Sequence, residues 1–177
     1  MLRHLLSKTS SRTVATAIAA CLVAGMLGAA PALATPASGF TAVQQLKGVY
    51  PPFTLNTSSD RRKDKDDKWD FKAMTKDTSD VYVTRNAIAA GGQSGWHSHP
   101  GPSLITVTIG TIKVYESTDP ACSPTTYHAG DGFVDYGDHA HLLRNESGAP
   151  AETVAVQFLP TGAARRIDEP KPTNCQF

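Results

Sequence analysis

Apolar and polar residues alternate with a period of two over much of the second half of the chain. Successive side chains of a β-strand point to opposite faces, so this alternation is typical of strands with one buried face. Gly, Pro and Asp separate the runs, as expected for tight turns. Roughly six to eight such strands predict an all-β sandwich or barrel. The alternating runs cover residues 81–84, 105–109, 112–114 and 153–158, with a shorter apolar run at 133–134.

The first 34 residues have the layout of a secretory signal peptide. Three basic residues precede an apolar run over residues 14–30, and Ala32 and Ala34 then supply small side chains at the −3 and −1 positions of a cleavage site. We therefore predict cleavage after Ala34 and a secreted or cell-envelope exterior location. The alternative is an uncleaved membrane anchor, since residues 14–34 are long enough to span a bilayer.

The rest of the chain is predicted to form one domain. Residues 35–72 are rich in Pro, Ser, Thr and charge and are interpreted as an N-terminal arm, partly irregular, beside the barrel. Residues 73–177 are interpreted as the barrel with a C-terminal tail. Without the three leader cations, 14 of the 17 Lys and Arg residues remain against 16 Asp and Glu residues. This near-neutral balance gives no reason to expect nucleic acid, or a membrane once the leader is removed, as a partner.

Two cysteines, Cys122 and Cys175, lie outside the leader. In an oxidising compartment an even number of cysteines in a small domain usually pairs. We therefore predict a disulfide that ties the C-terminal tail to a mid-chain loop.

The candidate chemistry lies in the histidines. In a strand, His97 and His99 project to the same face, and regular alternation would place Ile105, Val107 and Ile109 on that face too. This apolar odd-numbered face is the predicted interior, so both imidazoles would point into a cavity, although the break at residues 100–102 leaves the register open by one residue. A second His-x-His pair, His139 and His141, offers a third imidazole, and three imidazoles can form a facial metal site with open positions.

The first His-x-His pair resembles the first motif of the cupin superfamily. Gly91, His97, His99 and Gly110 stand at the spacing of that motif, and Ser103 stands where the motif has glutamate.

The second His-x-His pair resembles the second cupin motif. Gly130, His141 and Asn145 fit its spacing, while Tyr136 and Asp138 replace its usual proline and glycine. The resemblance covers roughly residues 81–159 and implies a double-stranded β-helix (jelly-roll) barrel. In detail the chain looks like a small exported bacterial cupin with a three-His variant of the metal motif.

The resemblance implies a divalent metal ion, one of Fe, Mn, Ni, Zn or Cu, held by His97, His99 and His141. Without the glutamate, germin-like and oxalate-degrading activities are in doubt. Three-His cupins include cysteine dioxygenase and diketone-cleaving dioxygenases, so a dioxygenase acting on a small oxygenated or anionic metabolite is one hypothesis. The alternatives are a non-catalytic module that binds a metal or a small molecule, and a purely structural barrel without an ion. By resemblance alone, the barrel could pair as a homodimer.

Other residues near the motifs have more than one interpretation. Ser103 could line the space beside the ion or hold a water molecule. His139 could be a fourth ligand, a group that orients His141, or an exposed turn residue. Trp96 and Tyr136 are interpreted as core or as pocket wall.

The sequence also suggests roles for three polar residues near the motifs. Arg144 and Gln157 could contact an anion in the cavity, whereas Asn145 is expected to fix a turn.

Overall fold

The computed structural model describes residues 34–58 and 70–176. The predicted signal peptide, apart from its last residue, lies outside the described residues. Within them every regular element is a strand, and no helix is long and apolar enough to cross a membrane. The strands are β1 (Ser38–Tyr50), β2 (Thr54–Ser58), β3 (Asp70–Met74), β4 (Ser79–Gln93), β5 (His97–Ser98), β6 (Ser103–Ile109), β7 (Thr111–Glu116), β8 (Thr125–His128), β9 (Gly132–Asp135), β10 (His141–Arg144), β11 (Ala151–Pro160) and β12 (Ile167–Asp168).

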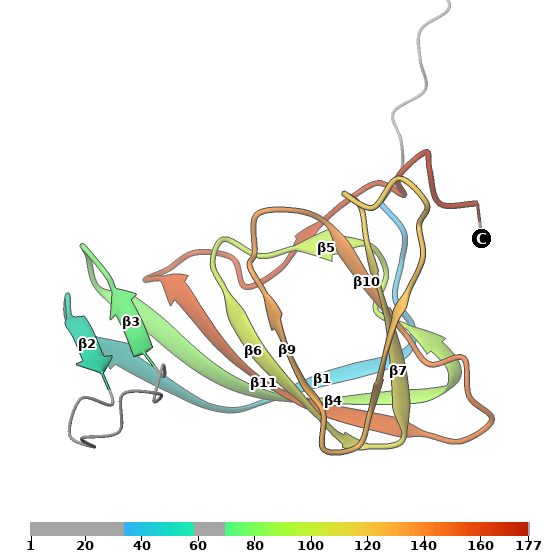
Figure 1. Ribbon diagram of the computed structural model, residues 1–177, viewed down its shortest axis with the longest axis horizontal. Coiled ribbons are helices and arrows are strands. Elements are labelled where there is room, and N and C mark those ends of the chain that lie inside the picture. Colours follow the sequence, from blue (N-terminus) through green and yellow to red (C-terminus); the bar gives the residue numbers. More distant parts are fainter. Residues whose placement is uncertain (1–33, 59–69, 177) are drawn as a thin grey trace, which may run out of the picture. The chain divides into compact units, whose positions relative to one another are not determined.

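Ten of the described strands form one antiparallel barrel sheet, and β2 pairs with β3 in a separate ladder. One side of the barrel has the order β1-β4-β11-β6-β9, and the other has the order β8-β7-β10-β5-β12 (Figure 1). The two sides meet where Arg144 of β10 pairs with Gln93 at the end of β4. This is the double-stranded β-helix arrangement, so the predicted fold class is confirmed.

The strand β4 is the longest of the described strands and pairs with a neighbour on each edge. Its partners are β1 and β11, and the β11 pairing runs without a shift from Ala151↔Ile88 to Pro160↔Ser79. Buried residues alternate with partly exposed ones along all of β11. Its sequence AETVAVQFLP thus follows the period-two pattern that predicted it.

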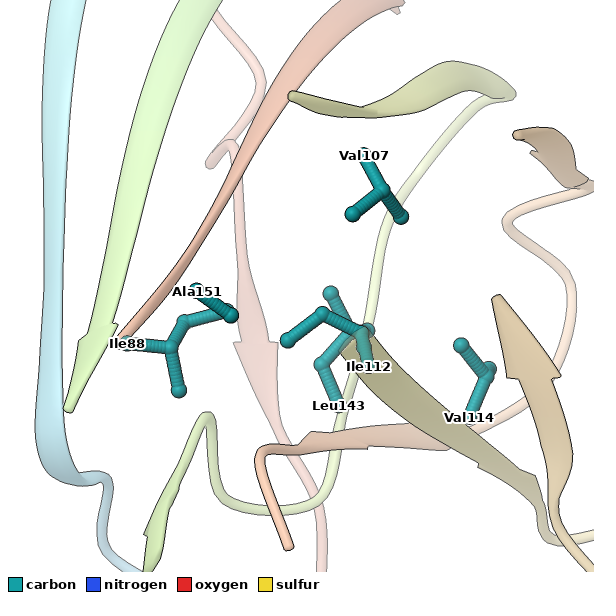
Figure 2. Close-up of a cluster of buried hydrophobic side chains, with 6 residues drawn as sticks. All are labelled: Ile88, Val107, Ile112, Val114, Leu143 and Ala151. Carbon is teal, nitrogen blue, oxygen red and sulfur yellow. The ribbon is translucent and has the colours of Figure 1, made fainter. Parts of the chain in front are cut away.

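Apolar side chains from five strands meet inside the barrel, as Figure 2 shows. None of them is more than 4% exposed, and Val107 and Ile112 are fully buried. Burial of apolar area is the main favourable contribution to folding, so this cluster stabilises the interior of the barrel. The cluster consists of Ile88, Val107, Ile112, Val114, Leu143 and Ala151.

The strand β1 differs from the sequence prediction, which is a partly irregular arm over these residues. It pairs with β4 from Tyr50↔Ser79 to Ser38↔Gln93, with two register shifts. Its side chains are nearly all exposed, including Val43 at 51% and Leu46 at 55%, so no alternation of buried and exposed positions marks it. The strand forms through backbone pairing with β4, which the periodicity of its own residues does not encode.

The predicted disulfide is confirmed, since Cys122 bonds to Cys175 with 5.3 Å between their Cα atoms. Cys175 is fully buried in a second apolar cluster with Trp96, Tyr115 and Leu142. Trp96 and Leu142 each adjoin a histidine of the motifs in sequence. The disulfide therefore anchors the tail to the cluster that supports those histidines.

The predicted role of Asn145 is also confirmed. Its amide nitrogen lies 2.8–3.1 Å from the carbonyl oxygens of Ile88, Ala89 and Ala149, and its side-chain oxygen accepts hydrogen bonds from the backbone and hydroxyl of Ser147. The side chain is fully buried. It therefore holds the turn after β10 against the end of β4 and does not reach the cavity.

Candidate metal centre

Two neighbouring strands bring three imidazoles together. His97 begins β5 and pairs across the strands with His141, which begins β10, while His99 follows β5 directly. The ring centroid of His97 lies 4.9 Å from that of His99 and 4.4 Å from that of His141, and the other two centroids are 5.3 Å apart. One nitrogen of each ring lies within 4.8 Å of the other two, so the cluster could hold a metal ion.

Backbone carbonyl groups orient two of the rings. The Nδ1 of His97 lies 2.8 Å from the carbonyl oxygen of Gly95, and the Nδ1 of His99 lies 2.5 Å from that of Arg165. A carbonyl oxygen only accepts hydrogen bonds, so each Nδ1 carries the hydrogen, and in a neutral ring the Nε2 keeps the lone pair. Such a hydrogen bond on the far nitrogen is the usual way in which a protein fixes a ligating histidine.

Burial keeps the three rings neutral. It lowers the pKa of His97 to about 2, with a further contribution from the nearby charges of His141 and Arg166. It also lowers the pKa of His141 to about 4, despite the opposing charge of Asp135, and it lowers the pKa of His99. Neutral imidazole is the form that binds metal ions, so the cluster needs no proton release at neutral pH.

A cavity of about 80 Å³ adjoins the imidazoles. One water molecule needs roughly 10–15 Å³ of such space, so the cavity has room for several waters or one small organic molecule. Positive charge is close, because the charge of Arg166 lowers the pKa of all three histidines. Besides the histidines, the lining includes apolar Phe40, Ile105 and Leu143, polar Asn86 and Gln157, and basic Arg165 and Arg166.

Comparison with known proteins identifies the barrel. Residues 85–157 match a family model described as a cupin domain. Residues 85–157 are therefore a cupin domain. No protein of curated function matches the sequence of this cupin.

Several solved structures resemble the cupin barrel at low identity. The cupin domain of an XRE family transcriptional regulator from Enterobacter cloacae is 15% identical, over 70% of this chain and 99% of that chain, with a TM-score of 0.43. A conserved protein with a double-stranded β-helix domain from Klebsiella pneumoniae is 20% identical, over 68% and 86%, with a TM-score of 0.42. An oxalate oxidase is 23% identical, over 46% of each chain, with a TM-score of 0.39.

Ser103, which replaces the glutamate of the first cupin motif, lines the cavity. It is 1% exposed, and its Oγ has no hydrogen-bond partner among the described residues.

The prediction that the odd-numbered apolar residues of β6 point into the barrel is confirmed for Ile105 and Val107, which are both buried. It is wrong for Ile109, which is 49% exposed, because a shift in the β6–β11 register just before Ile109 changes the face to which it points.

His139 lies outside the three-histidine cluster. Its Nε2 lies 2.9 Å from Glu116 Oε2 and its Nδ1 lies 2.5 Å from Asp138 Oδ1. Burial lowers the pKa of His139, but Asp138 and Glu116 outweigh this effect and raise it overall. With both nitrogens beside carboxylates, His139 is not placed to serve as a fourth ligand.

Three further residues do not line the cavity. Tyr136, the residue after β9, is 68% exposed, because Asp135 at the end of β9 points inward and the next side chain points outward. Trp96 lies in the disulfide cluster and not in the pocket wall. Arg144 lies 3.4 Å from Glu146, whereas Gln157 does line the cavity, with its Nε2 3.4 Å from the Nδ1 of His99.

Sequence reasoning missed Asp135, a carboxylate buried beside the histidines. It is 5% exposed, with Oδ2 3.6 Å from His99 Nε2 and Oδ1 3.5 Å from His141 Nδ1. The alternation of Phe133, Val134 and Asp135 was a usable signal, since it places Asp135 on the same face as Phe133. The pairing of β9 with β6, which brings Asp135 opposite Ser103, is not encoded in either run alone.

Proposed function

We propose that this cupin barrel binds one divalent metal ion, one of Fe, Mn, Ni, Zn or Cu, through His97, His99 and His141. The observation that carries the proposal is the convergence of three neutral, largely buried imidazoles on the wall of one cavity. Hydrogen bonds from two Nδ1 atoms to backbone carbonyls leave the corresponding Nε2 atoms free for an ion. Such a donor set suits borderline transition metals.

The cavity supports a small oxygenated or anionic molecule as the ligand of the bound ion. Three neutral imidazoles do not compensate the 2+ charge of the ion, and Arg166 adds positive charge nearby. The amide groups of Asn86 and Gln157 also line the cavity and offer hydrogen bonds there. A bound divalent metal would supply Lewis acidity and, if redox active, electrons for O₂ chemistry.

For location, we propose that the protein is exported and cleaved after Ala34. The leader composition and the Cys122–Cys175 disulfide both support an oxidising compartment. Mass spectrometry of the secreted protein should give a chain that begins at Thr35. A secreted chain that retains the leader would contradict cleavage and favour the anchor alternative.

Metal analysis of the purified protein tests the site. We expect about one equivalent of bound divalent metal in the wild type, and an affinity at least about 100-fold lower in a His97→Ala/His141→Ala variant, because losing ligands should exceed the 10–100-fold cost of losing outer contacts. The matched control is His128→Ala/His139→Ala, which removes two histidines outside the cluster and should retain the metal. Equal metal content in wild type and the ligand variant would rule out the site.

A second experiment separates catalysis from simple binding. If the protein is a dioxygenase, the metal-loaded wild type should consume O₂ with a member of a panel of diketones, flavonols and thiols, and the ligand variant should not. Binding of panel members without O₂ consumption would favour the non-catalytic module.

A further inference from the structure

The strongest unexplained feature of the site is the buried carboxylate of Asp135. We propose that Asp135 is a fourth ligand of the metal ion, and that it supplies from β9 the carboxylate that the cupin motif loses at Ser103. This assignment rests on the proposed function, since it presupposes an ion held by the three histidines.

The fold places Asp135 next to the position of the missing glutamate. Ser103 of β6 and Asp135 of β9 are directly paired across the antiparallel strands. Side chains paired in this way lie on the same face with their Cβ atoms about 4.5–5.5 Å apart. Both are buried, at 1% and 5% exposure. A carboxylate on β9 therefore reaches the space that a glutamate on β6 would otherwise fill.

The distance to His99 is that of two ligands of one ion. Two donor atoms each about 2.1 Å from a metal, at bond angles of 90–120°, lie about 3.0–3.6 Å apart. Asp135 Oδ2 lies 3.6 Å from His99 Nε2, which is too long for a hydrogen bond. The hydrogen bond from His99 Nδ1 to Arg165 leaves a lone pair on this Nε2, so the two facing atoms are both electron-pair donors.

The two oxygens of Asp135 have different surroundings. Oδ1 accepts a hydrogen bond of 2.9 Å from the backbone nitrogen of Gly137. Oδ2 is buried and has no hydrogen-bond partner among the described residues. A buried carboxylate oxygen without a partner carries a large desolvation cost, and a cation between it and His99 removes that cost.

The turn after β9 is built to hold the carboxylate in place. Gly137 has a φ of 83°, and a Cβ at this position would lie 2.4 Å from the carbonyl oxygen of Gly101. Only glycine fits here, so the backbone nitrogen that binds Oδ1 is fixed by the fold. Oδ2 is thereby directed toward the histidines.

A competing role for Asp135 is to position His141, whose Nδ1 lies 3.5 Å from Oδ1. The two roles predict different results when a carboxylate is returned from the other strand. A glutamate at position 103 could reach the ion, as in the full motif, but it would not replace a hydrogen-bond acceptor for His141.

The test uses Co²⁺ as the probe, with affinity measured by chelator competition and coordination followed by visible absorption. We expect Asp135→Asn, which is isosteric and keeps the Oδ1 acceptor, to weaken Co²⁺ binding by about 10–100-fold and to change the absorption bands. Adding Ser103→Glu to this variant should restore the affinity to within a few-fold of wild type. Asp138→Asn, which removes an exposed charge nearby, is the matched control and should bind like wild type.

Each other outcome overturns the assignment in a distinct way. An Asp135→Asn variant with wild-type affinity and spectrum would show that Asp135 does not contact the ion. Weakened binding with unchanged bands and no rescue by Ser103→Glu would show that Asp135 acts on the histidines through its charge and is not a ligand. A wild type that binds no Co²⁺, while thermal unfolding shows it to be folded, would overturn the proposed function itself and this assignment with it.

Discussion

Lowering the pH from 7 to 5 is expected to reduce the free energy of unfolding of the metal-free protein by roughly 3–4 kcal/mol. Burial depresses the pKa of His97 to about 2 and that of His141 to about 4 in the folded state, from an ordinary value of 6.5. Below pH 6.5 these two histidines are protonated in the unfolded chain but stay neutral in the folded chain. Stability is therefore lost at about 1.4 kcal/mol per pH unit for each of these histidines until its folded pKa is reached.

Urea unfolding at pH 7, 6 and 5 in the presence of a chelator measures this loss. His139 acts in the opposite direction, because its pKa is raised in the folded state, and it offsets part of the effect. A His97→Gln/His141→Gln variant cannot take up these protons and should show a much flatter dependence on pH. An equally steep dependence in this variant would mean that acid sensitivity arises elsewhere.

Reduction of the Cys122–Cys175 disulfide should lower the free energy of unfolding by about 4 kcal/mol. The bond closes a loop with a sequence separation of 53 residues, and the chain-entropy model gives about that value for a loop of this length. Cys175 also lies in the cluster with Trp96 and Leu142, so the loss includes weakened packing behind the histidines. Urea unfolding of oxidised and reduced protein at pH 7 measures the difference.

The matched variant for this experiment is Cys122→Ala/Cys175→Ala. It should unfold at the urea concentration of the reduced protein, and added reductant should not shift it further. If reductant left the wild-type midpoint unchanged, the disulfide would contribute nothing to stability. A shift of equal size in the variant would instead place the effect of the reductant outside this bond.

Alternation along single runs of sequence was enough to predict the barrel and most of the cluster. His97 and His99 share a face in any extended chain, and Ile105 and Val107 marked that face as buried. The third imidazole followed from a second pattern of the same kind and from the resemblance to the cupin motifs. These features are local, so the sequence alone encodes them.

The features that were missed depend on contacts between strands. The strand β1 forms on the edge of β4 with its side chains exposed, so its residues show no buried face. Ile109 is displaced by a register shift against β11, and Asp135 reaches the histidines because β9 pairs with β6. Neither the shift nor the pairing can be derived from one run considered by itself.

The residues after β11 form part of the histidine site. Ile167 and Asp168 form β12, which pairs with the strand that carries His97, and the carbonyl of Arg165 fixes the ring of His99. The cupin family model ends at residue 157, before all of these groups. Two cupins with the same barrel strands could therefore differ in the orientation of a ligating ring and in the charge at the cavity, if only the residues after β11 differ.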